Sequence, residues 1–155
     1  RLTKTPVQLE QLVEECIAYH RDTVQSKKLQ IIGPQNPQRQ VVEADRNRIR
    51  QVLDHFIDNA ILSSAPGGCI NVNLVQTGDR VRVEVIDDGA GLREEYLQTL
   101  FEDGELDESR NADSLSLCKQ LIELHQGEIG AINTDDNKGT TFWFCLPLFK
   151  LRPVE

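Results

Sequence analysis

Three short segments of the chain carry residue types that could hold a ligand. In the first, His55 and Asn59 stand four residues apart beside an apolar stripe, so a helix would present both on one face. An asparagine oxygen is a ligand that Mg²⁺ accepts together with phosphates and waters. The imidazole titrates near neutral pH and suits either a base or a packing residue. A solvated asparagine and a packed histidine are the plainer alternatives, and the helix pattern by itself favours them.

The second segment begins where an alternating strand ends, at Asp87, and continues with Gly89 and Gly91. Glycines let the backbone approach a ligand closely and adopt positive φ. An ionised aspartate only accepts hydrogen bonds, so it suits the exocyclic amine of a purine. An ordinary strand-to-helix turn has the same pattern. The third segment, 137–144, contains Thr140 and by itself predicts only a turn that leads into a hydrophobic strand.

Hydrophobic periodicity predicts the elements that must position these segments. Apolar residues recur at three- and four-residue spacing in the expected helices and alternate in the expected strands. Asp45 is the expected N-cap of the clearest helix. The predicted helices span 7–22, 46–63, 94–101 and 115–125, and the predicted strands lie at 29–32, 41–42, 70–74, 81–85, 128–133 and 140–146.

This element order predicts the fold class. Two of the strand pairs are hairpins, which imply antiparallel pairing, and three helices can cover one face of such a sheet. The sequence therefore predicts an α+β fold, a two-layer α/β sandwich in which a mixed, mostly antiparallel sheet is covered on one face by three helices.

Length and composition limit the class of protein. The chain has 155 residues, which corresponds to one domain. Its 17 Lys and Arg against 25 Asp and Glu give a net charge of −8, so nucleic acid is not an expected partner. No apolar run approaches the ~20 residues of a membrane span. The absence of Met indicates a fragment or a processed chain, in which we expect 1–6 to be a linker and 150–155 a tail.

The cysteines and histidines form no metal-binding pattern. None of the cysteines belongs to a C-x-x-C pair, and the three histidines are scattered along the chain. We therefore expect buried free thiols in a reducing cytoplasm. These thiols are Cys16, Cys69, Cys118 and Cys145.

Taken together and in order, the segments closely resemble the catalytic and ATP-binding domain of sensor histidine kinases. These kinases belong to the GHKL superfamily, with DNA gyrase, the MutL proteins and the heat-shock chaperone ATPases. The resemblance rests on Asn59-Ala60, Asp87-x-Gly89-x-Gly91, the helix exit 122–129, and Gly139-Thr140-Thr141-Phe142 before Leu146-Pro147-Leu148. The stretches 51–60 and 121–127 are similar to the kinase branch in particular. The resemblance implies a Bergerat-type fold, with an ATP-binding domain over 7–149.

The resemblance also implies a role for each matching residue. Asn59 would hold Mg²⁺ against the phosphates of ATP, and Asp87 would accept a hydrogen bond from the adenine amine. Gly89 and Gly91 would flank the adenine pocket, and Thr140 would support Asp87, often through water. Residues 102–113 would form the ATP lid.

The chain departs from the family pattern around the phosphates. Where the family has a second glycine motif, Ser114, Ser116 and Leu117 stand in the sequence Ser-Leu-Ser-Leu. Each non-glycine residue forced into a left-handed conformation costs roughly 1–2 kcal/mol, although Ser114 can instead cap the helix. Leu62 occupies the position three after Asn59, where the family often has a basic residue. In the acidic lid, Arg110 is the residue that we nominate for phosphate, the alternative being a solvated acidic loop.

Two functions follow from this comparison. The first is a histidine kinase domain that binds Mg-ATP and passes the γ-phosphoryl to a histidine on a separate dimerisation domain, and from there to a response regulator. None of this chain's histidines has the acceptor setting, so we expect a monomeric donor in the cytoplasm, whose parent protein can carry a membrane anchor. The alternative is a degenerate docking module with weak or no ATP binding. A water-hydrolysing ATPase is disfavoured because His55 replaces the activating glutamate.

Overall fold

A computed structural model of the chain describes residues 2–102, 112–134 and 138–149. The helices are α1 (Leu9–Ser26), α2 (Arg46–Ser63), α3 (Glu94–Thr99) and α4 (Ala112–Leu124). The strands are β1 (Thr5–Gln8), β2 (Gln30–Ile32), β3 (Val41–Ala44), β4 (Cys69–Thr77), β5 (Arg80–Ile86), β6 (Glu128–Asn133) and β7 (Thr140–Pro147).

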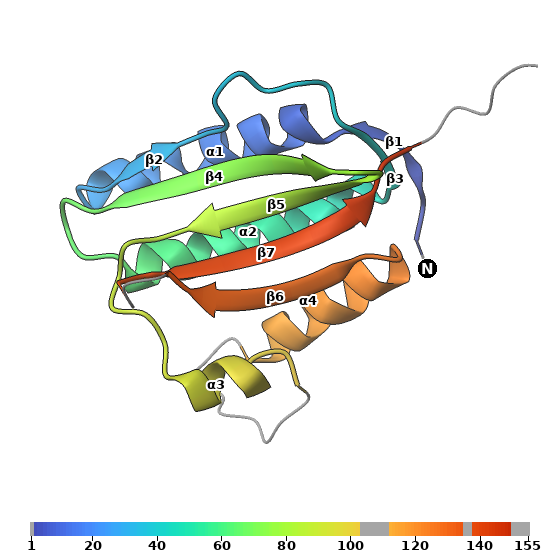
Figure 1. Cartoon of the computed structure of the whole chain (residues 1–155). Coiled ribbons are helices and arrows are strands. Elements are labelled where there is room, and N and C mark those ends of the chain that lie inside the picture. Colours follow the sequence, from blue (N-terminus) through green and yellow to red (C-terminus); the bar gives the residue numbers. More distant parts are fainter. Residues whose placement is uncertain (1, 103–111, 135–137, 150–155) are drawn as a thin grey trace, which may run out of the picture.

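Five of the strands form one sheet in the order β2-β4-β5-β7-β6. The pair β2–β4 is parallel, and the other three pairs are antiparallel. Helices α1, α2 and α4 lie together behind this sheet, and the short α3 lies beyond its β6 edge (Figure 1). The predicted α+β sandwich, with a mixed sheet covered on one face by three helices, is confirmed.

The core lies between the sheet and the three helices. Alternate residues of β5 and β7 point toward the helices and are buried, and α2 buries one stripe against them. Phe56 of α2 is at the centre, with ring centroids 5.2 Å from Phe142 and 6.0 Å from Phe144. Burial of such large apolar side chains supplies the main free energy of folding.

The N-terminal segment differs from the sequence-based expectation. Thr5 and Pro6, expected in a linker, belong to β1, which pairs antiparallel with β3 in a separate two-stranded sheet. The first helix consequently begins at Leu9, two residues later than predicted, and continues to Ser26. Proline is compatible with an edge strand because its missing N–H faces away from the partner.

Asp45 connects three parts of the fold at the start of α2. Its side chain caps the helix by accepting from the Arg48 N–H at 3.3 Å, and it also accepts from the Thr3 N–H at 3.0 Å. Its own backbone N–H donates to Nε2 of His125 at 3.0 Å, while Nδ1 of that ring lies 2.7 Å from the Leu121 carbonyl oxygen. Because Nε2 accepts, Nδ1 carries the proton, and His125 is a structural residue.

The thiols divide into two groups, which corrects the expectation of four buried cysteines. All four are free, but Cys69 and Cys145 are only half-buried. Burial raises the pKa of Cys16 and of Cys118 to about 12, so these two remain protonated at neutral pH.

None of the helices in the described residues has the length and apolar character needed to cross a bilayer.

The position of Phe56 leads to a stability prediction. Phe56→Ala is expected to lower the free energy of unfolding by about 3–5 kcal/mol, because it leaves a cavity against Phe142 and Phe144. Leu62→Ala is the matched control on the same helix, since Leu62 is 70% exposed, and it is expected to change the free energy by less than about 0.5 kcal/mol. Urea unfolding followed by circular dichroism measures both. Equal losses for the two variants would contradict this account of the core.

Candidate functional site

The site is centred on Asp87, which directly follows β5 and is only 3% exposed. Its Oδ1 accepts from the backbone N–H of Gly89 at 2.9 Å and from that of Thr140 at 3.2 Å. The Ser63 side chain, at the end of α2, lies close enough to the carboxylate to favour its charged form, while its hydroxyl donates to the Ala60 carbonyl at 3.3 Å. The register of β5 and β7 sets Ile86 opposite Thr141, which brings Asp87 and Thr140 together as the next pair.

Burial determines the charge state of this carboxylate. Loss of solvation raises the pKa of Asp87 above its ordinary value, and the hydrogen bonds from Gly89 and Thr140, together with the nearby Ser63, oppose this rise only in part. A buried aspartate whose pKa is raised and whose oxygens are held in one orientation is poised to accept a hydrogen bond from a ligand donor. Such perturbed groups concentrate at functional sites.

Two glycines let the backbone close around Asp87. A Cβ added to Gly89 would lie 2.3 Å from the carbonyl oxygen of Ser63, inside any real contact distance. At Gly139, φ is +112° and an added Cβ would lie 2.1 Å from the carbonyl oxygen of Asp87. The loop that follows β5 can therefore approach the end of α2 only because Gly89 lacks a side chain, and the loop that precedes β7 can approach Asp87 only because Gly139 does.

Helix α2 presents a polar stripe that leads to the same point. His55, Asn59 and Ser63 follow each other at four-residue spacing and so lie on one side of the helix. Ser63 reaches Asp87, so Asn59 lies one turn away, about 6 Å along the helix axis. Asn59 is half-buried. The amide and the carboxylate that the sequence singled out are thereby brought to the same end of α2.

His55 is the most unusual member of this stripe. Its Nε2 is buried and has no hydrogen-bond partner among the described residues. Burial lowers the pKa of His55, although the nearby charge of Asp58 opposes this effect, so the ring is neutral at pH 7. A neutral imidazole with an unpaired buried nitrogen can accept or donate a hydrogen bond when a polar group arrives.

The neighbouring face of α2 is fixed to α1. His20 is buried, with Nε2 3.0 Å from Oδ1 of Asp54 and Nδ1 3.5 Å from Oδ1 of Asp58. Burial raises the pKa of Asp54, but the hydrogen bond with His20 and the charge of Arg50 outweigh it, and the net pKa is lowered. These contacts between His20 of α1 and the carboxylates of α2 fix how α2 is rotated and therefore where the stripe of His55 and Asn59 points.

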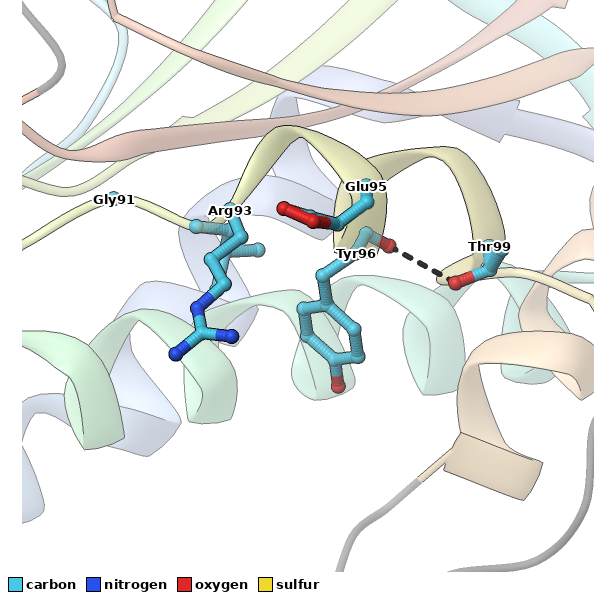
Figure 2. Close-up of a pocket in the computed structure, with 6 residues that line it drawn as sticks. Gly91, Arg93, Glu95, Tyr96 and Thr99 are labelled. Atoms are coloured by element: carbon cyan, nitrogen blue, oxygen red, sulfur yellow. Dashed lines mark hydrogen bonds between the residues drawn. The ribbon is translucent and has the colours of Figure 1, made fainter.

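A pocket lies further along the chain from Asp87, beside α3. It has a volume of about 610 Å³ and is lined by Gly91, Leu92, Arg93, Glu95, Tyr96 and Thr99 (Figure 2). Gly91 has φ of +82° and turns the chain into this wall. Asn133 at the end of β6 holds the wall in place, since its side chain accepts from the Leu92 N–H at 2.9 Å and donates to the Leu92 carbonyl at 2.6 Å.

The remaining predicted site residues are placed only in part. Ser116 is buried and Leu117 is partly exposed on α4. The backbone N–H of Thr140 donates a hydrogen bond to Oδ1 of Asp87. A role for the Thr140 side chain stays a prediction. Arg110 and the side chain of Ser114 lie outside the described residues.

Sequence reasoning missed several residues that the structure brings to the site. Ser63, Asn133, Arg93 and the crowding at Gly139 were not anticipated as parts of the site. Only Gly139 carries a local signal, since a glycine beside Lys138 before a strand is a typical turn. In the described part of the chain, no three His, Cys, Asp or Glu side chains form a cluster able to hold a metal ion.

The fold and the site together define the class of α/β-sandwich ATPase domains. The chain belongs to the family of histidine kinase-, DNA gyrase B- and HSP90-like ATPases, which it matches over residues 44–150. The match includes the stripe on α2, the glycine loop after β5 and the start of β7.

Curated relatives of the chain are adaptive-response sensory kinases called SasA. The protein from Crocosphaera subtropica is 32% identical over an alignment of 153 positions, which covers 95% of this chain and 40% of the relative. The protein from Gloeothece citriformis is 33% identical over an alignment of 156 positions, which covers 97% of this chain and 39% of the relative. The chain thus spans about two fifths of the length of these relatives.

Solved structures agree with this family. The catalytic domain of the histidine kinase ThkA has a TM-score of 0.84 at 26% identity and covers 94% of this chain and 97% of that domain. ThkA in complex with the response regulator TrrA has a TM-score of 0.81 at 28% identity, with 94% and 42% covered. Full-length ShkA in complex with AMPPNP has a TM-score of 0.85 at 24% identity, covers 99% of this chain and 33% of ShkA, and supports the fold alone.

The contact between Gly139 and Asp87 generates a prediction about the site. Gly139→Ala is expected to lower the free energy of unfolding by more than the 1–2 kcal/mol that a left-handed conformation costs, because the added methyl also pushes on the backbone of Asp87. Gly67→Ala is the matched control, since Gly67 has φ of +90° but nothing within 4 Å of an added Cβ. Urea unfolding gives the free energies, and amide chemical shifts of Asp87 and Thr140 report the local change. Equal losses and unchanged shifts would show that the loops are not tightly packed.

Proposed function

We propose that this chain is the nucleotide-binding catalytic domain of a two-component sensor histidine kinase, which binds Mg-ATP and donates the γ-phosphoryl to a histidine on a separate domain. The observation that carries the proposal is the buried carboxylate of Asp87, held by Gly89 and Thr140 beside Ser63, with its pKa raised. The orphaned Nε2 of His55, one turn of α2 before Asn59, is a second feature that a polar ligand would complete.

The residues present fit an adenine nucleotide. Asp87 accepts a hydrogen bond from the exocyclic amine of adenine, and Leu92, held by Asn133, offers an apolar surface to the ring. Gly89 and Gly91 leave room for the base beside the backbone. Guanine is disfavoured at this position because it presents a carbonyl oxygen where adenine has its amine, and a carboxylate only accepts.

The metal site follows from the same arrangement. Mg²⁺ is bound by a small number of protein oxygens, with phosphates and water completing six ligands. Asn59 is the protein ligand in this proposal, since its side chain lies on the stripe that ends at Asp87. Bound there, Mg²⁺ would neutralise part of the charge on the phosphates. The lack of a three-ligand cluster among the described residues agrees with a metal that arrives with the nucleotide.

His55 is the proposed catalytic residue. It is neutral at pH 7 because burial lowers its pKa, and it lies one turn of α2 from Asn59, on the same side. From this place it can accept a proton or hold a polar group of the incoming acceptor. The phosphoryl group would pass from ATP to an acceptor nitrogen, with ADP as the leaving group. Arg110, Ser114, Ser116, Leu117 and Thr140 stay in the proposal as residues near the nucleotide.

The proposed partners are the parent protein's own histidine-containing dimerisation domain and a response regulator. The solved complex of ThkA with the response regulator TrrA is the precedent for the second partner. A cytoplasmic location and a monomeric state of this domain complete the proposal.

Asp87→Asn separates binding from stability. Because the pKa of Asp87 is raised, the folded state holds the proton more tightly than the unfolded state. The free energy of unfolding therefore falls as pH rises from the ordinary aspartate pKa through the raised one. The neutral variant avoids this cost and is expected to be at least as stable at pH 7.

The affinity of Asp87→Asn for Mg-ATP is expected to fall about tenfold to a hundredfold, since a charge-assisted hydrogen bond is lost. Urea unfolding and calorimetric titration measure the two effects, and an unstable variant that still binds ATP would refute the assignment.

His55→Asn tests the proposed catalytic residue. The variant is expected to bind Mg-ATP within about twofold of the wild type but to transfer phosphoryl at least about a hundredfold more slowly, the range of a general base. With labelled ATP and the parent's histidine-containing domain supplied in trans, the wild-type rate should fall on acidification only below the ordinary histidine pKa, because burial lowers the pKa of His55. The variant should lose this pH dependence. An unchanged transfer rate would leave His55 with a packing role only.

A further inference from the structure

The pocket beside α3 is lined by one positively charged side chain, that of Arg93, which the sequence analysis did not single out. Arg93 immediately precedes α3, and its side chain is exposed. Figure 2 shows the guanidinium of Arg93 and the phenol of Tyr96 extending from the same side of the α3 segment, the side on which the α2 ribbon passes in this view. Within the described residues, Arg93 takes part in none of the ion pairs of the protein.

The backbone of this wall is held by hydrogen bonds, so the point from which the Arg93 side chain extends is fixed. The two hydrogen bonds from Asn133 hold Leu92 on both its N–H and its carbonyl. Leu92 also packs against the core. The Arg93 carbonyl accepts from the N–H groups of Tyr96 and Leu97, both at 3.0 Å, which anchors it in the first turn of α3. A cation held on such a wall loses less freedom when it binds an anion than one on a loose loop.

The other charged side chains around the pocket are acidic and would repel an anionic ligand. The other charged side chain that lines the pocket is Glu95. Asp58 beside Asn59 and the pair Asp87 and Asp88 in the glycine loop are also acidic. The end of α2 contributes the neutral Leu62. Among the residues that line the pocket, Arg93 is the positively charged group.

We propose that Arg93 binds the phosphate oxygens of the nucleotide, from the wall of the pocket that the residues before α3 form. The inference rests on the proposed nucleotide function and adds the residue that recognises the anionic part of the ligand. The planar guanidinium presents several donors in a fixed geometry that matches phosphate oxygens. Glu95 sets a limit on this attraction, because it places a negative charge on the same wall.

The test compares ligands that differ in the number of phosphates. ATP, ADP, AMP and adenosine are titrated with Mg²⁺ into the wild-type domain and into Arg93→Gln, by calorimetry at low and at physiological salt. The variant is expected to bind ATP about tenfold more weakly, a change of about 1.4 kcal/mol, and to bind adenosine as the wild type does. Arg93→Lys should recover part of the loss, and the difference between wild type and Arg93→Gln should shrink as salt rises.

Two further variants make the result specific. Arg39→Gln removes an equally exposed arginine from the loop between β2 and β3 and should leave every affinity unchanged. Glu95→Gln should strengthen ATP binding about twofold while leaving adenosine unaffected. Urea unfolding of each variant checks that the fold is intact.

The outcomes are distinguishable. If the wild type binds neither ATP nor adenosine, the proposed function itself is wrong, and the assignment of Arg93 falls with it. If the wild type binds ATP and Arg93→Gln binds it equally well, only the assignment of Arg93 is overturned. An equal loss for ATP and adenosine would place Arg93 at the base or in the fold, and would overturn the assignment to phosphate as well.

Discussion

The buried carboxylate of Asp87 constrains most of what surrounds it. An aspartate removed from water needs hydrogen bonds from fixed donors, and here they come from the loop after β5 and the start of β7, with Ser63 at the end of α2 close by. Each donor needs its own element in register. The pairing of β5 with β7 brings Thr140 to the carboxylate, and the packing of α2 on the sheet brings Ser63. The ligand site is thus a product of the core and not an addition to it.

The fold could largely be predicted because its hydrophobic pattern is regular. The alternating valines of β4 and β5 and the stripe of α2 each have one period and one buried face, so their elements and the two hairpins follow. Strand β1 could not be predicted, since Thr-Pro-Val-Gln has no alternation and becomes a strand only by pairing with β3. The parallel pairing of β2 with β4 was likewise not visible, because it joins segments separated by a whole helix.

The site was predictable where a residue type is chemically distinctive, and not where it depends on packing. Asp87 and Asn59 stood out because the segments that contain them, in their order and spacing, resemble the family motifs, although each segment alone has a plainer interpretation. Ser63 and Asn133 are ordinary in sequence and acquire their contacts only when distant elements meet. Arg93 gave no signal for the same reason, since an exposed arginine before a short helix has no periodic partner. The structure therefore identifies Arg93 as a cation and Ser63 and Asn133 as supporting residues, which local sequence patterns do not predict.

The hydrogen bonds at Asp45 give α2 a mechanical role. The helix has 18 residues, so it is a rigid strut about 27 Å long. At one end it is tied to the segment ahead of β1 through the Thr3 N–H, and at the other it meets Asp87 through Ser63. Tension or torque on the residues that lead into β1 therefore acts on α2, the helix that carries His55 and Asn59. The segment ahead of β1 is thereby coupled, through the Asp45 cap, to the helix that carries His55 and Asn59.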